Sequence, residues 1–430
     1  MAKYFGTNGV RGLFNELDPA LAMKLAQAIG RYLKGKIIVA RDCRLTGGTL
    51  KASVVSGLAS VGCDVIDLGI VSSPTAEFMI KKLKAEGCVI ITASHNPPEW
   101  NAIKVVDGNG IAISKERGEQ IEKLMEGVLA TWDKVGRITR YENATKDHIN
   151  AIIELVGTVE KKKIVLDCGN GTAAVIAPAL FKELGAEIVT LNSHLDGKFP
   201  GRPSEPTKDN VKELIIAVKS TNADAGIAWD ADGDRVIFVD ETGEYVIGDK
   251  VFALSILWNE KKGDVVTTVA TSKAIEDVSE NVRYTAIGAP YLCEEMVKKE
   301  AVMGGEEVGG VIWPELCLAK DGFMTGAVMV KKISEKKLSK WLEEVPEYHN
   351  VKHKIPANSE EKKQIVAKVL AHAKTNNLDY LDVDGVRINL ENSWVIVRAS
   401  GTENYIRIFA EAKTIEEAEK LVSEYEKIIK

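Results

Sequence analysis

Short runs of apolar, mostly β-branched residues alternate along most of the chain with longer segments whose apolar positions follow the helical period. The short runs predict strands, and the segments between them predict helices. This alternation is typical of parallel sheets whose strands are joined by helices. It starts afresh at residues 163 and 264, which predicts three related units. The predicted strands lie at residues 36–40, 63–68, 88–92, 163–167, 187–191, 225–229, 264–268 and 282–285.

A different pattern follows residue 346. A strand, a helix, a hairpin, two more strands and a closing helix are predicted there, with the first three at 348–355, 359–374 and around 384–385. Thr414, with Glu417 three residues later, has the spacing of a capping box and predicts where the closing helix begins. We therefore expect an α/β protein with three related mixed α/β domains and a C-terminal α+β domain around a central cleft. The expected limits are 1–149, 150–249, 250–346 and 347–430.

Composition narrows the class of protein. The chain has 430 residues, 45% hydrophobic and 27% charged, as in ordinary globular enzymes, and a net charge of -6 gives no reason to expect nucleic acid or an anionic membrane as a partner. Its six cysteines form no CxxC pair, and no apolar run approaches twenty residues. We expect a cytoplasmic enzyme without disulfides or membrane spans.

Three carboxylates in one tight loop are the clearest chemical signal. Asp230, Asp232 and Asp234 follow a predicted strand, and Gly233 lets the backbone curl so that their oxygens converge. Such a set suits a hard cation, and Mg²⁺ is preferred because Arg235 occupies the position where a calcium-binding EF-hand needs glycine. The alternative is a solvated acidic turn.

Ser94 lies in a loop stiffened by two prolines, directly after another predicted strand. Its hydroxyl could act as a nucleophile or carry a phosphoryl group. A serine turn or helix cap is the plainer alternative. His95 adjoins the serine, but a serine–histidine–acid hydrolase is disfavoured because the chain has no GxSxG motif and a neighbouring ring rarely reaches the hydroxyl.

Three further segments could contact a phosphorylated ligand. Residues 398–404 combine a guanidinium, hydroxyls and a glycine, followed by Arg407, as in a phosphate cradle; a surface turn could have the same composition. Residues 304–310 place Glu306 and a second carboxylate between glycines, which suits sugar hydroxyls or a flexible acidic hinge. Arg11 stands between glycines near the N-terminus and could reach a phosphate. Ligands of open α/β sheets bind beyond strand ends, so these loops could share one site.

These motifs, in this order and over essentially the whole chain, resemble the α-D-phosphohexomutase family. The resemblance implies that Ser94 is a phosphoserine and that Asp230, Asp232 and Asp234 hold one Mg²⁺ per chain against its phosphate. Arg11 and Lys104 would flank the reacting hydroxyl, and His95 is a further catalytic candidate. Substrate contacts would come from Glu306, Arg235, Arg398, Ser400, Gly401, Thr402 and Arg407.

The resemblance also implies a reaction: interconversion of hexose 6-phosphate and hexose 1-phosphate through a 1,6-bisphosphate. The opening residues 5–7 favour phosphoglucosamine mutase, with a bifunctional phosphomannomutase/phosphoglucomutase as the alternative. Val308 and Gly310 replace the serine and histidine of the family's Glu-x-Ser-Gly-His loop, and Asn8, Ala289 and Asn404 also depart from the pattern. A serine-dependent phosphatase or a non-catalytic sugar-phosphate-binding protein therefore stays open. We expect a monomer or homodimer.

Overall fold

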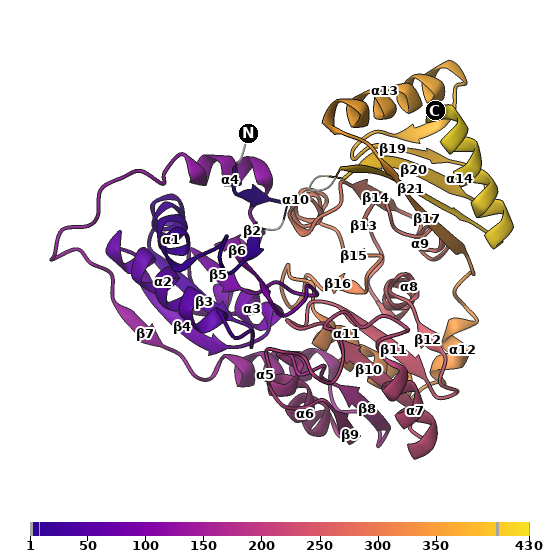
Figure 1. The fold of residues 1–430 in the computed structure, drawn as a ribbon. Coiled ribbons are helices and arrows are strands. Elements are labelled where there is room, and N and C mark those ends of the chain that lie inside the picture. Colours follow the sequence, from indigo (N-terminus) through magenta and orange to yellow (C-terminus); the bar gives the residue numbers. More distant parts are fainter. Residues whose placement is uncertain (1–2, 8, 401–403, 430) are drawn as a thin grey trace.

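The computed structural model describes residues 3–7, 9–400 and 404–429. Within these ranges the strands form four sheets, and helices pack against each of them (Figure 1). Figure 1 shows the sheets in chain order, from the indigo sheet on the left, through the second below and the third in the middle, to the yellow one at the upper right. The expected succession of three α/β units and a final α+β unit is confirmed.

The first sheet has the strand order β1-β2-β6-β5-β3-β4-β7, and its central strands are parallel while its β1–β2–β6–β5 side is antiparallel. Every residue of β5 is buried, so this strand reads as a continuous apolar run. The strands are β1 (Phe5–Gly6), β2 (Gly9–Leu13), β3 (Lys36–Arg41), β4 (Asp64–Ile70), β5 (Gly87–Ile91), β6 (Trp100–Asp107) and β7 (Ile138–Arg140); the helices are α1 (Pro19–Leu33), α2 (Gly47–Ser60), α3 (Ser73–Leu83) and α4 (Lys115–Glu122).

The second sheet has the order β12-β11-β10-β8-β9, and the third has the order β14-β13-β15-β16. In each, a parallel core is extended at one side by antiparallel strands. The strands of both are β8 (Lys163–Asp167), β9 (Glu187–Leu191), β10 (Ala225–Trp229), β11 (Val236–Asp240), β12 (Tyr245–Val246), β13 (Val265–Thr268), β14 (Val282–Thr285), β15 (Met303–Glu306) and β16 (Gly310–Ile312). Their helices are α5 (Ala144–Val156), α6 (Ala173–Leu184), α7 (Lys212–Thr221), α8 (Gly248–Trp258), α9 (Ala274–Val278), α10 (Ala289–Lys299), α11 (Gly322–Lys332) and α12 (Leu338–Leu342).

The fourth sheet is antiparallel throughout, with the order β17-β21-β20-β19-β18. Two helices cover one of its faces. Thr414 accepts a hydrogen bond from Glu417 N at 3.2 Å, as the capping motif predicts for the last helix. The elements are β17 (His349–Pro356), α13 (Ser359–Thr375), β18 (Asp379–Leu381), β19 (Val386–Asn389), β20 (Trp394–Ala399), β21 (Tyr405–Ala412) and α14 (Ile415–Ile429).

Two of the expected domain limits fall inside helices. The limit at 149/150 lies within α5, whose buried stripe of Ile149, Ile152 and Val156 is continuous across it, and the limit at 249/250 lies within α8. A helix with one continuous apolar face packs as a single body. The domain limits therefore remain a prediction. We propose that each true limit lies at one end of its helix and not inside it.

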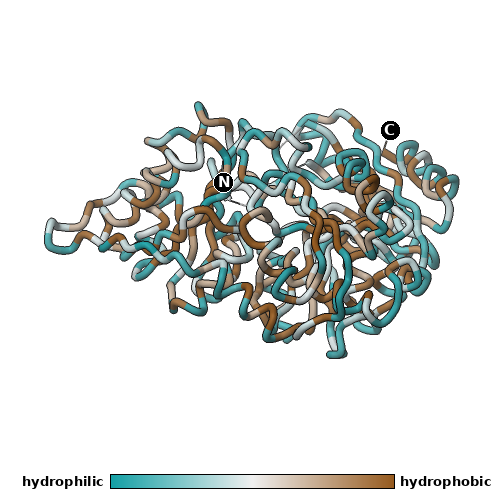
Figure 2. Tube along the Cα trace, turned by 90° about the horizontal axis from the view of Figure 1, so that it is seen from below, coloured by the Kyte–Doolittle hydropathy of each residue, from teal (hydrophilic) through white to brown (hydrophobic). Residues whose placement is uncertain are grey.

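Apolar side chains of the second and third sheets form one shared core. Trp229, at the end of β10, stacks on Phe323 of α11 with ring centroids 5.5 Å apart. The first and fourth sheets have cores of their own. Figure 2 shows the corresponding hydropathy pattern, with hydrophilic segments along the outer helices and loops. Of the described helices, none combines the length and the apolar character needed to cross a membrane.

Candidate active site

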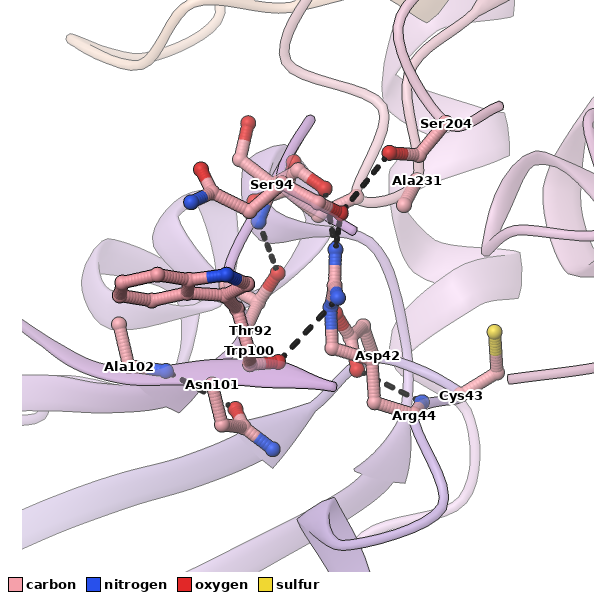
Figure 3. A network of polar contacts seen from close by, with 12 residues as sticks. Asp42, Cys43, Arg44, Thr92, Ser94, Trp100, Asn101, Ala102, Ser204 and Ala231 are labelled. Carbon is pink, nitrogen blue, oxygen red and sulfur yellow. Dashed lines mark hydrogen bonds and ion pairs between the residues drawn. The ribbon is translucent and has the colours of Figure 1, made fainter. Parts of the chain in front are cut away.

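Ser94 lies three residues past the end of β5 and has a left-handed backbone, with φ of 49°. Non-glycine residues rarely adopt this conformation, so the surrounding structure must hold it. Ser94 N donates to Thr92 Oγ1 at 3.0 Å. The fully buried guanidinium of Arg44 donates to the carbonyl oxygen of Ser94 at 2.7 Å (Figure 3). It also donates to the carbonyl oxygen of Asn96 at 2.7 Å. Arg44 in turn is paired with Asp42, with 3.0 Å between Nε and Oδ2.

The second domain completes the support of this loop. Ser204 Oγ donates to the carbonyl oxygens of His95 and Asn96, at 2.7 and 3.0 Å. The ring of Phe199 lies 5.0 Å from the guanidinium carbon of Arg44. The conformation of the serine loop therefore depends on residues of two sheets.

Three aspartates face Ser94 from the loop after β10, as the sequence predicts. One carboxylate oxygen from each of Asp230, Asp232 and Asp234 lies within 4.8 Å of the other two, and all three side chains are buried. Ser94 Oγ donates to Asp230 Oδ2 at 2.6 Å. Gly233, with φ of 79°, provides the turn, and its N–H donates to Asp230 Oδ1 at 3.1 Å.

The donors around this loop leave a place for a cation. Asp232 Oδ1 and Asp234 Oδ1 are buried without a hydrogen-bond donor among the described residues. Burial and the charges of its two neighbours raise the pKa of Asp230 well above its usual value. Such uncompensated oxygens are what a hard divalent ion requires, so the three residues fit Mg²⁺.

Two lysines flank the aspartates. Lys104 Nζ lies 2.7 Å from Asp232 Oδ2 and 3.6 Å from Asp234 Oδ2. Lys320 Nζ lies 3.5 Å from Asp234 Oδ2 and 2.9 Å from Glu306 Oε2. Burial opposes ionisation of Asp232, Lys104 and Lys320, but the opposite charges outweigh it: they lower the pKa of Asp232 and raise the pKa of both lysines. The lysines are therefore fully protonated at neutral pH.

Sequence reasoning missed Lys320. A side chain added at Gly310 would place its Cβ 2.5 Å from Lys320 Cδ, so the lysine occupies the space beside that glycine. Gly310 is the position at which the family pattern has a histidine, and that departure was the one available signal. Ser73, which donates to Asp232 Oδ2 at 2.6 Å, and Glu77, one helical turn later, were also missed. Burial raises the pKa of Glu77 to about 8.

Glu306 is buried, but it does not lie in a loop as expected from residues 304–310. Gly304, Gly305 and Glu306 belong to β15, which pairs with β13 and β16. The two glycines are what allow this, because a Cβ at Gly305 would lie 2.5 Å from the ring of Phe252. The carboxylate thus comes from a rigid strand rather than from a hinge.

Arg11, His95 and Arg235 lie around the serine loop. Arg11 Nη1 donates to Asn96 Oδ1 at 3.0 Å, and Arg235 Nη1 forms an ion pair with Glu205 at 2.9 Å. His95 Nδ1 is 3.5 Å from Ser94 Oγ. Burial, with the charges of Arg235 and Arg11, lowers the pKa of His95 to about 3, so its ring is neutral at physiological pH.

The predicted phosphate-binding residues form a second group, on the fourth sheet. Arg398, on β20, forms an ion pair with Asp384 at 2.8 Å, and Arg407, on β21, is its cross-strand neighbour. Ser400 N donates to the carbonyl oxygen of Tyr405 at 3.0 Å. Gly401 and Thr402, as well as Asn8, lie outside the described residues.

Family models match the chain along nearly all of its length. They are the phosphoglucomutase/phosphomannomutase alpha/beta/alpha domains I, II and III, over residues 2–130, 146–243 and 247–348, and the C-terminal domain of the same family, over residues 354–428. Together with a serine facing a carboxylate triad, they define the class of protein: the chain belongs to the phosphoglucomutase/phosphomannomutase family, the α-D-phosphohexomutases.

Curated relatives narrow the description. A phosphoglucomutase/phosphomannomutase of Thermococcus kodakarensis is 40% identical over 97% of this chain and 96% of its own, and a probable phosphoglucosamine mutase of Methanopyrus kandleri is 39% identical over 100% and 98%. A Burkholderia thailandensis family member shares the fold, with a TM-score of 0.88, 24% identity and coverage of 98% and 96%. The protein is accordingly a phosphohexomutase, an isomerase, as the sequence motifs predict.

Proposed function

We propose that this phosphohexomutase interconverts hexose 6-phosphate and hexose 1-phosphate through phospho-Ser94. The observation that carries the proposal is the 2.6 Å contact between Ser94 Oγ and Asp230 Oδ2 inside a buried carboxylate triad. A phosphoryl group on that oxygen would lie next to the aspartates, and the ammonium group of Lys104 is 2.7 Å from one of them, Asp232. Mg²⁺ held by Asp230, Asp232, Asp234 and a phosphoserine oxygen would neutralise charge on the transferring group.

The remaining residues then align donor and acceptor. The free hydroxyl of the sugar attacks phosphorus, the bond from phosphorus to Ser94 Oγ breaks, the hydroxyl proton passes to a base, and the serine oxygen regains a proton. This step gives a hexose 1,6-bisphosphate. The bisphosphate then reorients, so that its other phosphate faces Ser94. The reverse step transfers that phosphate to Ser94. Because the transition state of phosphoryl transfer is loose, positioning and charge neutralisation supply most of the rate.

We assign the other candidates roles that agree with their surroundings. Lys104 and Arg11 flank the reacting hydroxyl. Neutral His95 offers a hydrogen bond rather than a charge, since its pKa is about 3. Glu306 contacts sugar hydroxyls, and Arg235 lies beside the transferring phosphate. The distal phosphate is held by Arg398, Ser400, Gly401, Thr402 and Arg407.

Glucosamine 6-phosphate is the sugar we propose, because curated relatives that match the whole chain are named probable phosphoglucosamine mutases. The relative at 40% identity, named phosphoglucomutase/phosphomannomutase, supports the alternative of mannose and glucose phosphates. We further propose that a hexose 1,6-bisphosphate primes Ser94, that the enzyme acts in the cytoplasm, and that it is a monomer or homodimer.

Conversion of the 6-phosphates of glucosamine, mannose and glucose, measured side by side with Mg²⁺ and a trace of the matching bisphosphate, tests the sugar. We expect the highest kcat/KM for glucosamine 6-phosphate. Equal or higher values for mannose and glucose would move the assignment to the alternative. Net release of phosphate without isomerisation would indicate a phosphatase.

Ser94→Ala tests the phosphoserine. We expect it to abolish conversion, because alanine lacks the hydroxyl proposed to carry the phosphoryl group, and to leave hexose phosphate binding within about twofold of wild type. Binding is measured by calorimetry. Conversion at the wild-type rate by this variant would refute the proposal.

A further inference from the structure

Three cations lie side by side across three strands of the fourth sheet. In the register of that sheet, Lys354 of β17 is opposite Arg407 of β21, and Arg407 is opposite Arg398 of β20. Residues directly opposite in antiparallel strands point to the same face, with their Cβ atoms about 5 Å apart. The row therefore presents an ammonium group and two guanidinium groups on one face of the sheet.

That face is turned toward the rest of the molecule. Ile396 and Phe409 form the next row on it, and they pack against Val269 and Ala270, which directly follow β13 of the third sheet. The helices α13 and α14 cover the opposite face. The cation row lies next to this contact on the same face of the sheet. At its β17 end the row is open to solvent, because Lys354 is exposed.

Acidic partners distinguish Arg398 from Lys354. Like charges directly opposite one another destabilise a sheet. Asp384 pairs with Arg398, but no carboxylate of a described residue lies within 4.0 Å of Lys354 Nζ. The lysine instead lies over the ring of Tyr405, 4.9 Å from its centroid, and Arg407 lies 5.4 Å from the same centroid. The shared ring holds both cations on one side of the sheet, where a phosphate could bridge them.

The same strand reaches a cavity next to the transfer site. Lys352, two residues before Lys354 and on the same face, lines a cavity of about 360 Å³ together with Arg235, Glu307 and Val308. This volume is within the range of small-ligand sites. The face that carries the cation row therefore also contributes Lys352 to a ligand-sized space, and that space reaches Arg235, directly after the aspartate loop.

We propose that Lys354 binds the distal phosphate of the hexose phosphate, alongside Arg407 and Arg398, so that β17 contributes to substrate binding. This inference rests on the proposed function. Lys354 would thus join the predicted phosphate-binding segment at 398–407, although it lies more than forty positions earlier in the chain. Lys354 contacts only the phosphate that is not being transferred, so it contributes binding that is equal in the ground state and the transition state.

Kinetics of Lys354→Gln test the inference, with Lys354→Arg as the conservative variant and Lys368→Gln, an exposed lysine on α13, as the matched control. Loss of one charge-assisted hydrogen bond should raise KM for the hexose phosphate about tenfold. We expect kcat to stay within about twofold, because uniform binding affects KM alone. Lys354→Arg should restore the wild-type KM, and Lys368→Gln should not change it.

Calorimetric titration with glucose 1,6-bisphosphate separates this inference from the proposed function. If the wild type converts sugars but KM and bisphosphate affinity are unchanged in Lys354→Gln, the inference is wrong and the mutase assignment stands. If the wild type converts no sugar, the proposed function fails, and weaker bisphosphate binding by Lys354→Gln would still support the phosphate site. An equal loss of affinity in Lys368→Gln would show a non-specific charge effect and overturn it.

Discussion

Lys320 shows how one side chain can compensate for the absence of another. Gly310 leaves open the space that a larger residue would fill, and the stem of Lys320 passes through that space to place its ammonium group between Glu306 and Asp234. A cation held by two carboxylates thus stands where the family pattern has a titratable ring. Because its pKa is raised by those partners, Lys320 keeps its charge at every physiological pH.

Gly310→His should therefore be poorly tolerated. The new Cβ would lie 2.5 Å from Lys320 Cδ, and such overpacking costs about 2 kcal/mol of unfolding free energy. In a Lys320→Ala background the same substitution should cost clearly less, since the obstructing atoms are gone. Denaturant unfolding of the two single variants and the double variant measures this coupling. Gly48→His, whose Cβ would meet its nearest neighbour at 4.0 Å, is the control; equal costs in both backgrounds would contradict the explanation.

The serine loop is the element whose shape most depends on distant residues. Arg44 follows β3 and Ser94 follows β5, and these strands are parallel neighbours, so both loops emerge at the same edge of the first sheet. The carbonyl groups of Ser94, Asn96 and Trp100 all accept hydrogen bonds from the Arg44 guanidinium. The planar guanidinium suits this task because its donors lie in a fixed fork, which an ammonium group lacks.

Arg44→Lys should lower kcat about a hundredfold while KM changes little, because a displacement of Ser94 near 1 Å has an effect of that order and Arg44 does not lie at the predicted substrate contacts. Steady-state kinetics give both constants. Arg31→Lys is the matched control: Arg31 also donates to backbone carbonyl groups of the first domain, those of Leu124 and Gly127, but away from Ser94. An unchanged kcat in Arg44→Lys would rule out this positioning role.

Elements with a strong local pattern were predicted well from the sequence. The strands at 163–167, 187–191, 225–229 and 282–285 match the structure residue for residue, since each is a short segment composed mainly of apolar or β-branched residues between polar turns. The family and its fold were predicted for a similar reason: the serine motif and the aspartate motif are each an uninterrupted stretch of sequence. Glu306 was placed in a loop, because paired glycines usually mark turns and only the tertiary contact with Phe252 explains them in a strand. Arg44, Ser73 and Lys320 act through contacts between segments far apart in the chain, which no local pattern reveals.

At the scale of the whole molecule, the four sheets do not form four independent cores. The second and third share one, joined through the stacked rings of Trp229 and Phe323, whereas the fourth has its own. The fourth sheet contacts the third through the apolar cluster of Ile396 and Phe409 and through Arg387. Arg387 lies 4.5 Å from the ring centroids of both Tyr284 and Trp394 and donates to the carbonyl group of Val269. Cooperative unfolding follows shared cores.

Hydrogen exchange in increasing denaturant should therefore show β10 and β13 losing protection together, with β20 losing it at a different concentration. Mass spectrometry of peptides from each strand reports this directly. Phe323→Leu should shift β10 and β13 by the same amount and leave β20 unshifted, because the ring belongs to the shared core alone. Separate shifts of β10 and β13 would mean that the second and third sheets unfold independently.

The distribution of the site over the chain has a consequence for its synthesis on the ribosome. Domains generally fold in the order in which they emerge. Ser94 would meet Asp230 once the second and third sheets, which share a core, have folded, whereas Arg398 and Arg407 emerge only near the end of translation. A nascent or prematurely terminated chain would thus display the nucleophile without the residues proposed to hold the far end of the sugar, and it would remain inactive until the last strand has been added.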